Sequence, residues 1–169
     1  MLCERVLGNI GTDPPARYAG KTRDALRVTW RDCARRAIRC RTERGISVGV
    51  LLPLGINLCH GDVVLETQST VVVAYVIPCE VWVAEFADAG SMATAALELG
   101  NLHIPVEVLE GVQLATLADG PARGVLDKWA ARWWPDTRRF HPLRSTVTTG
   151  SVRVAPGLEV RNQLTKRRE

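Results

Sequence analysis

One histidine of this chain, His103, is a candidate metal ligand. The stretch Leu99-Gly100-Asn101-Leu102-His103-Ile104-Pro105 places His103 between a helical pattern and a strand pattern. We expect Gly100 to end the helix in the left-handed C′ position, which would leave His103 at the mouth of the strand. An imidazole is a suitable ligand for divalent transition-metal ions. A lone histidine beside a strand is nevertheless more often a plain surface or core residue, so its surroundings must decide.

Charge is unevenly distributed along the chain, and the segment that contains His103 has no basic residue. Residues 1–44 hold 11 basic and 5 acidic side chains, residues 45–122 hold 9 acidic and no basic ones, and residues 123–169 hold 11 basic and 4 acidic ones. The central segment is therefore predicted to be locally anionic and to favour a cation. Its carboxylates near the histidine in sequence are Glu98, Glu107 and Glu110. The basic ends could meet an acidic partner or nucleic acid, but solvated surface charge is the favoured explanation of these ends.

Several classes of protein are not expected. No window approaches the roughly 18 consecutive apolar residues of a membrane span, and the N-terminus lacks the pattern of a secretory signal, so we expect a cytoplasmic location. The five cysteines are odd in number and show no Cys-x-x-Cys spacing, which predicts neither a disulfide framework nor a structural zinc site. The adjacent Cys59 and His60 are interpreted as structural or incidental, because a Gly-Asp turn follows them.

The hydrophobic pattern predicts an α+β protein. Residues 1–78 show closely spaced short strands, typical of a small β-sandwich or barrel. Residues 79–142 show the order β-α-β-β-α-β of a ferredoxin-like domain, and residues 143–169 are predicted to be a flexible basic tail. The first helix is expected to begin at Asp88. The second is expected to follow Asp119 and to end at Pro135, with one face formed by Leu126, Trp129, Ala130 and Trp133.

A chain-long series of motifs resembles the UreE family of urease accessory proteins, which are nickel metallochaperones. The opening stretch is similar to the family's Leu-Gly-Asn-Arg-His-x-Pro motif, and further matches occur in the same order over about residues 1–142. The main ones are Glu4-Arg5-Val6-Leu7-Gly8-Asn9, Val48-Gly49-Val50-x-Leu52-Pro53-x-Gly55, Gly61-Asp62-Val63-Val64, Pro78-x-Glu80 and Phe140-His141-Pro142. Singly each match is weak, whereas the ordered set is fairly specific.

The resemblance implies a function and a site. It implies a homodimer formed through the ferredoxin-like domains, with His103 of both subunits sharing one nickel(II) near the two-fold axis. It implies no enzymatic activity, a partner-binding or peptide-binding N-terminal domain, and other urease accessory proteins and apo-urease as partners. Copper or zinc could occupy the same ligands in vitro. His141 is the second candidate ligand.

The chain also departs from the family pattern. Leu97 and Glu98 stand where many members have Tyr-His, and Leu102 replaces the arginine before the histidine. The histidine-rich C-terminal tail of many members is absent. Two alternatives therefore stay open. One is a divergent scaffold that has lost tight metal binding. The other is a ferredoxin-like module that binds nucleic acid, which we favour less because paired exposed aromatic residues are missing from the strands.

Overall fold

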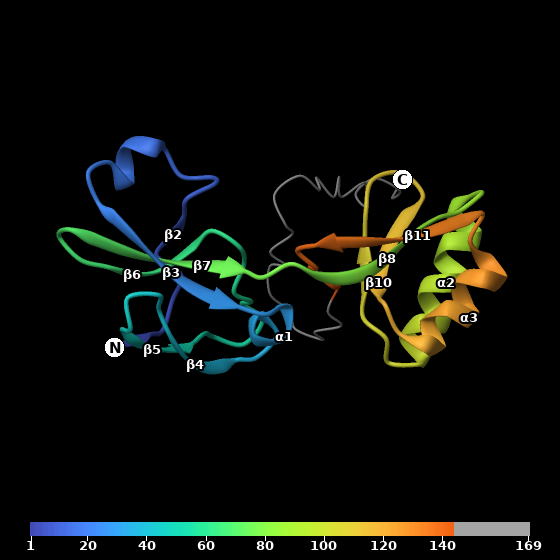
Figure 1. The fold of residues 1–169 in the computed structure, drawn as a ribbon, viewed down its shortest axis with the longest axis horizontal. Helices are drawn as coiled ribbons and strands as arrows, with labels where there is room; N and C mark the ends of the chain where they lie inside the picture. The colour runs from blue at the N-terminus through green and yellow to red at the C-terminus, as the bar shows by residue number, and fades with distance from the viewer. Residues whose placement is uncertain (144–169) are drawn as a thin grey trace, which may run out of the picture.

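The structure, a computed structural model, describes residues 1–143. It has two lobes joined by the continuous run from β7 to β8 (Figure 1). The N-terminal lobe contains two sheets, one with strand order β1-β5-β4 and one with order β2-β6-β7-β3. Its elements are β1 (Leu2–Cys3), β2 (Gly8–Asn9), the 3-10 helix η1 (Pro15–Tyr18), β3 (Thr22–Val28), α1 (Trp30–Cys33), β4 (Ala37–Arg41), β5 (Ser47–Leu51), β6 (Asp62–Glu66) and β7 (Thr70–Val76).

The two N-terminal sheets form a sandwich around a core of aliphatic side chains. Alternate residues of β3, such as Leu26 and Val28, are buried between the sheets together with Val48 and Val50 of β5. Burial of such side chains contributes about 1.5–3 kcal/mol each. Arg23 and Arg27 of β3 point to the other side of this sheet and are exposed, whereas Val71 and Val73 of β7 are buried on that side beside Tyr18. The predicted β-sandwich is thereby confirmed.

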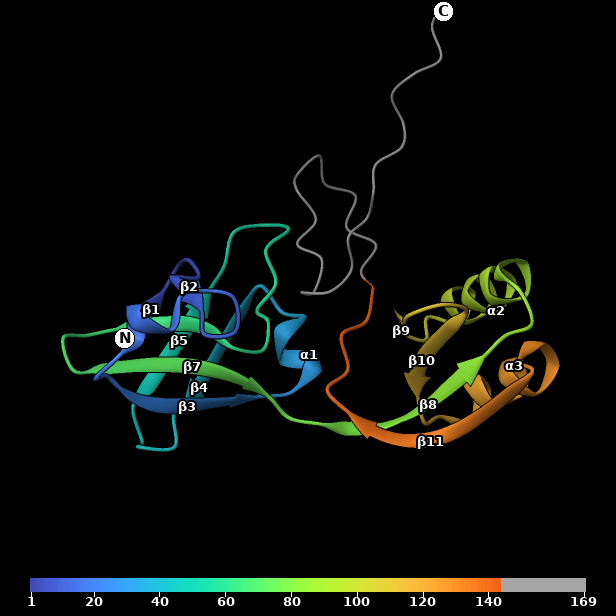
Figure 2. The same ribbon diagram turned by 90° about the horizontal axis from the view of Figure 1, so that it is seen from above.

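The C-terminal lobe has the ferredoxin-like topology that the sequence predicted. Its sheet has the antiparallel order β11-β8-β10-β9, and both longer helices cover one face of it (Figure 2). The elements are β8 (Cys79–Glu85), α2 (Ala89–Asn101), β9 (Val106–Val108), β10 (Gln113–Leu117), α3 (Gly120–Trp129) and β11 (Arg132–Arg138). Asp88 is the N-cap of α2, and its carboxylate accepts the Ser91 N–H at 2.8 Å.

The second helix is shorter than predicted. It ends at Trp129, and Trp133 and Pro135 lie in β11 rather than on the helix. Seven residues of β11 pair with β8, and this pairing outweighs the local helical pattern. Successive strand residues face opposite ways, so Trp133 packs on the helix side of the sheet and Trp134 on the other side. Pro135 is tolerated because β11 is an edge strand.

The chain after β11 covers part of the open face of the ferredoxin-like sheet. Phe140 is fully buried there against Val81, Val83 and Ala115. Its ring also makes an edge-to-face contact with Trp30 of α1, with 5.5 Å between ring centroids. The N–H of Leu143 donates to the carbonyl of Val106 in β9 at 2.7 Å, at the opposite edge of the sheet from β11. Residues 139–143, which we call the crossing segment, therefore link both lobes. The predicted tail lies almost wholly outside the described residues.

Candidate metal-binding site

His103 occupies the turn that ends α2. Its φ is 57°, and within residues 1–143 it is the only non-glycine residue with a positive φ. The His103 N–H donates to the carbonyl of Gly100 at 2.9 Å, and the Ile104 N–H donates to the carbonyl of Leu99 at 2.9 Å. These two hydrogen bonds define a Schellman motif in which His103 is the left-handed C′ residue.

The prediction that Gly100 holds this C′ position is wrong. Gly100 belongs to the last turn of α2, and a Cβ added there would meet nothing within 4 Å. Leu99 and Ile104 fix the turn instead, because both are buried in the same core cluster and stand at the positions that usually touch in this motif. The left-handed conformation consequently falls on His103, where a side chain costs about 1 kcal/mol relative to glycine.

The His103 side chain is exposed and unengaged. Within residues 1–143 its imidazole makes no hydrogen bond, ion pair or ring contact. Nothing in the packing therefore explains why a histidine stands where glycine would be more stable. A strained residue with a free ligand group at the surface is the kind of feature that marks a functional site. Both imidazole nitrogens remain available to a ligand or a metal ion.

Most of the carboxylates near His103 in sequence form ion pairs with basic residues from later in the chain. Glu98 accepts the Trp129 indole N–H at 2.6 Å and pairs with Lys128 at 3.3 Å. The hydrogen bond from Trp129, and then Lys128, lowers the pKa of Glu98. Glu107 pairs with Arg138 at 3.7 Å. The predicted anionic surface near His103 is therefore largely neutralised, and the imidazole rather than a carboxylate cluster is the candidate metal ligand of this region.

His141, the second candidate, has a different environment. It follows Phe140 on the crossing segment, and its backbone N–H donates to the Glu107 carboxylate at 3.1 Å. Burial lowers the pKa of its imidazole, while Glu107 opposes that shift. A lowered pKa favours the neutral imidazole, which is the form that binds metal ions. Within the described residues, however, no group of three or more His, Cys, Asp or Glu side chains converges as a metal site.

His60 packs against β7 in the N-terminal lobe. Its Nδ1 accepts the Val76 N–H at 3.3 Å, and its ring meets the Tyr75 ring edge-on at 5.4 Å between centroids. Burial is the main cause that lowers its pKa, followed by the positive charge of Arg139. These contacts agree with the structural interpretation of His60. The neighbouring Cys59 is half-buried, and its N–H donates to the Asp62 carboxylate at 2.8 Å.

Comparison with known proteins finds similarity to one family of proteins. The model of the UreE urease accessory protein N-terminal domain matches residues 3–77. The urease accessory protein UreE of Lysinibacillus sphaericus (strain C3-41) is 26% identical over 140 residues, which cover 83% of this chain and 93% of the relative. That of Actinobacillus pleuropneumoniae is 30% identical over 122 residues, covering 71% and 65%. That of Haemophilus influenzae (strain PittGG) is 27% identical over 146 residues, covering 85% and 74%.

The chain is similar to urease accessory proteins of the UreE family.

The match to the UreE N-terminal model coincides with the N-terminal lobe. It begins at Cys3 in β1 and ends at Ile77, directly after β7. The matches to whole relatives, such as that of 146 residues, are longer than this lobe and therefore include part of the ferredoxin-like lobe. The similarity thus extends over both lobes. No helix in the described part of the chain is long and apolar enough to span a membrane.

Sequence reasoning missed a second group of polar residues. Arg23, His60, Tyr75 and Arg139 line one pocket of about 400 Å³ although they are far apart in sequence. Neither spacing nor periodicity carries a signal for such a group, because only the β3–β7 pairing and the crossing segment bring its members together. The Trp30–Phe140 contact was missed for the same reason.

Proposed function

We propose that this protein is a urease accessory protein that binds nickel(II) as cargo and delivers it for assembly of the urease active site. His103 is the proposed ligand. The single observation that carries the proposal is an exposed, unengaged imidazole held in the left-handed C′ position of α2. This position favours glycine, so the imidazole is retained at a cost to stability.

A single imidazole is a poor site for nickel, which prefers several nitrogen and oxygen ligands. We therefore propose a homodimer in which the C-terminal lobes place two copies of His103 at one metal ion. A two-fold axis doubles every ligand that lies near it. Partly filled coordination suits a carrier, because ligands from the recipient can enter as those of the donor leave. Copper and zinc are expected to compete in vitro, since both accept imidazole.

The proposal assigns distinct roles to the parts of the chain. Residues 1–78 would bind a protein partner, and residues 79–142 would dimerise and hold the metal. The partners would be other urease accessory proteins and apo-urease in the cytoplasm. The protein would make and break no covalent bond, so it would not be an enzyme. His141 would be at most an auxiliary ligand, because its backbone is tied to Glu107 and its ring is half-buried.

The open sheet face bears on the nucleic-acid alternative. Ferredoxin-like domains that bind RNA use exposed aromatic residues on this face. Here Phe140 and Trp30 cover the centre of the face, and Phe140 is fully buried. The nickel proposal is therefore favoured over nucleic-acid binding.

Nickel titration calorimetry combined with size-exclusion chromatography tests the proposal. The wild type is expected to bind about one nickel ion per dimer. His103→Asn keeps a residue that tolerates the left-handed region but removes the imidazole, and it should abolish this binding while the dimer persists. His60→Asn is the matched control and should retain the wild-type affinity. Unchanged nickel affinity in His103→Asn would show that His103 is not the ligand.

A further inference from the structure

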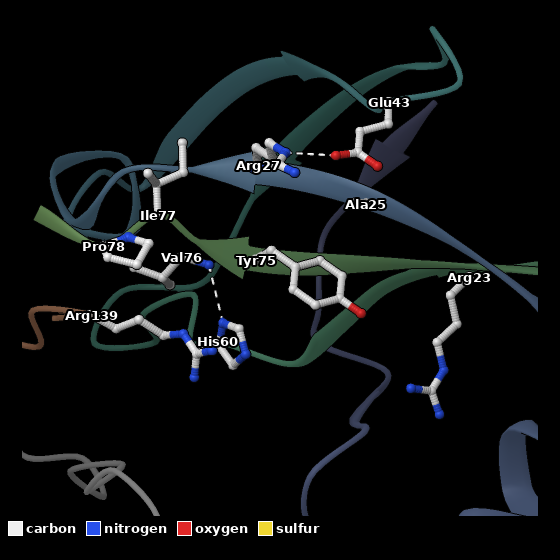
Figure 3. A pocket seen from close by; sticks show the side chains of 10 residues that line it. All are labelled: Arg23, Ala25, Arg27, Glu43, His60, Tyr75, Val76, Ile77, Pro78 and Arg139. Carbon is white, nitrogen blue, oxygen red and sulfur yellow. Dashed lines mark hydrogen bonds and ion pairs between the residues drawn. The ribbon is translucent and has the colours of Figure 1, made fainter.

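A basic pocket lies where the N-terminal lobe meets the crossing segment. Its volume is about 400 Å³, within the range of pockets that bind small ligands or short side-chain groups. Arg23 and Arg27 come from β3, Tyr75 from β7, His60 from the loop before β6, and Arg139 from the segment after β11 (Figure 3). Both lobes therefore contribute to it.

The pocket carries positive charge that the described chain does not neutralise. Arg27 is paired with Glu43 at 2.6 Å, so these two charges cancel. Arg23 and Arg139 form no ion pair within residues 1–143, and both are exposed. They lie on opposite sides of the Tyr75 ring (Figure 3). Two separate guanidinium groups are thus available, each able to hold one carboxylate through a pair of N–H donors.

The centre of the pocket is apolar and ordered by hydrogen bonding. The half-buried Tyr75 ring contacts His60 edge-on, and His60 Nδ1 accepts the Val76 N–H. In the neutral imidazole the proton is therefore assigned to Nε2, which leaves one further donor. Ile77 and Pro78 add apolar surface at the end beside Arg139.

Packing of its neighbour fixes the backbone at Arg139. Phe140, the next residue, is fully buried between the ferredoxin-like sheet and Trp30. The C-terminal lobe therefore delivers one guanidinium to a pocket that otherwise belongs to the N-terminal lobe.

We propose that this pocket binds a pair of carboxylate groups joined by an apolar spacer. The carboxylates would pair with Arg23 and Arg139, and the spacer would lie on Tyr75. Such a ligand is either an acidic segment of a protein partner or a free di- or tricarboxylate. A polyphosphate chain fits less well, because the free arginines are separated and Glu43 stands on the rim. Nucleic acid also fits less well, because the pocket offers a single aromatic ring for base stacking.

Fluorescence anisotropy at about 0.15 M salt, where long-range charge effects are screened, tests the proposal. The probe is a fluorescein-labelled Glu-Glu-Leu-Glu-Glu peptide, and citrate and a single-stranded DNA oligonucleotide serve as competitors. Arg139→Gln and Arg23→Gln should each weaken probe binding about tenfold, because each removes a charge-assisted pair. Arg39→Gln, an exposed residue of β4 outside the pocket, makes the same charge change and should weaken binding by less than about twofold.

The competitors identify the source of the carboxylates. Displacement by citrate at lower concentration than unlabelled peptide would indicate a free carboxylate, and the reverse would indicate a peptide. Absence of saturable binding by the probe and by citrate would overturn the proposal. Equal losses in all three arginine variants, or displacement by DNA more effectively than by peptide and citrate, would overturn it as well.

A spectroscopic readout separates direct binding from a structural effect of the variants. Burial is the main cause that lowers the His60 pKa, and the nearby charges of Arg139 and His141 lower it further, while the Tyr75 ring packs against the imidazole. A bound carboxylate would offset these charges, so the His60 pKa measured by NMR should rise on addition of the peptide. An unchanged pKa on saturation would contradict the proposed position of the ligand. The inference is independent of nickel binding, and His103→Gly should bind the peptide as the wild type does.

Discussion

Histidine side chains have opposite environments at the His103 turn and at the lobe junction around His60 and His141. His103 has a costly backbone conformation and an exposed, unengaged ring. His60 and His141 are half-buried, lie beside packed aromatic residues and have lowered pKa values. The junction histidines are thus explained by local structure, whereas His103 is not. This difference is the reason that nickel binding is proposed at His103, the position that packing leaves unexplained.

Phe140→Ala should have the largest effect on stability, and that effect should be confined to the junction between the lobes. Removal of this fully buried ring would leave a cavity between the sheet and Trp30, with an expected loss of about 3–5 kcal/mol in the free energy of unfolding. Urea unfolding monitored by tryptophan fluorescence measures it. Nickel affinity of the folded fraction should stay unchanged. A loss below about 1 kcal/mol would contradict the role of Phe140 in joining the lobes.

Asp88→Ala tests the opposite end of the helix that carries His103. The Asp88 carboxylate accepts the Ser91 N–H at 2.8 Å, so its loss should lower the free energy of unfolding by about 1 kcal/mol. Asp88→Asn retains an acceptor and should cost less. Thermal unfolding of both variants measures the difference. Nickel affinity that fell with Asp88→Ala would show that the His103 turn depends on the whole helix.

The junction histidines should make stability depend weakly on pH. Burial lowers the pKa of His141 and His60 below the ordinary value of 6.5. The unfolded chain therefore binds more protons than the folded chain in this range, and stability should fall as the pH drops below about 6.5. Urea midpoints at several pH values between about 5 and 7.5 would show this decline. His141→Gln should reduce the slope, and an unchanged slope would assign the effect to other groups.

The sequence predicted the parts of the fold that local chemistry controls. Asp88 caps α2 as expected, and Ala95 and Leu99 face the core at helical spacing. The prediction failed where distant residues decide. Gly100 has the right chemistry for a helix end, but the contact between Leu99 and Ile104 moves the end to His103. Trp133 fits a helical pattern, yet pairing with β8 places it in a strand.

His103 itself was found in the sequence, but its significance was not visible there. Periodicity cannot show that a histidine adopts a left-handed backbone or that its ring is unengaged. Charge counting predicted an anionic surface, which Lys128 and Arg138 largely neutralise from later in the chain. The junction pocket had no sequence signal at all.

His103→Gly measured for both stability and nickel binding tests the central claim most directly. Glycine adopts φ of 57° without strain, so this variant should be as stable as the wild type or more stable by up to about 1 kcal/mol. His103→Ala should be less stable than His103→Gly by a similar amount. Both variants should lose nickel binding in calorimetry. A His103→Gly protein that is stable but binds no nickel is the predicted result, and one that binds nickel with wild-type affinity would contradict the account.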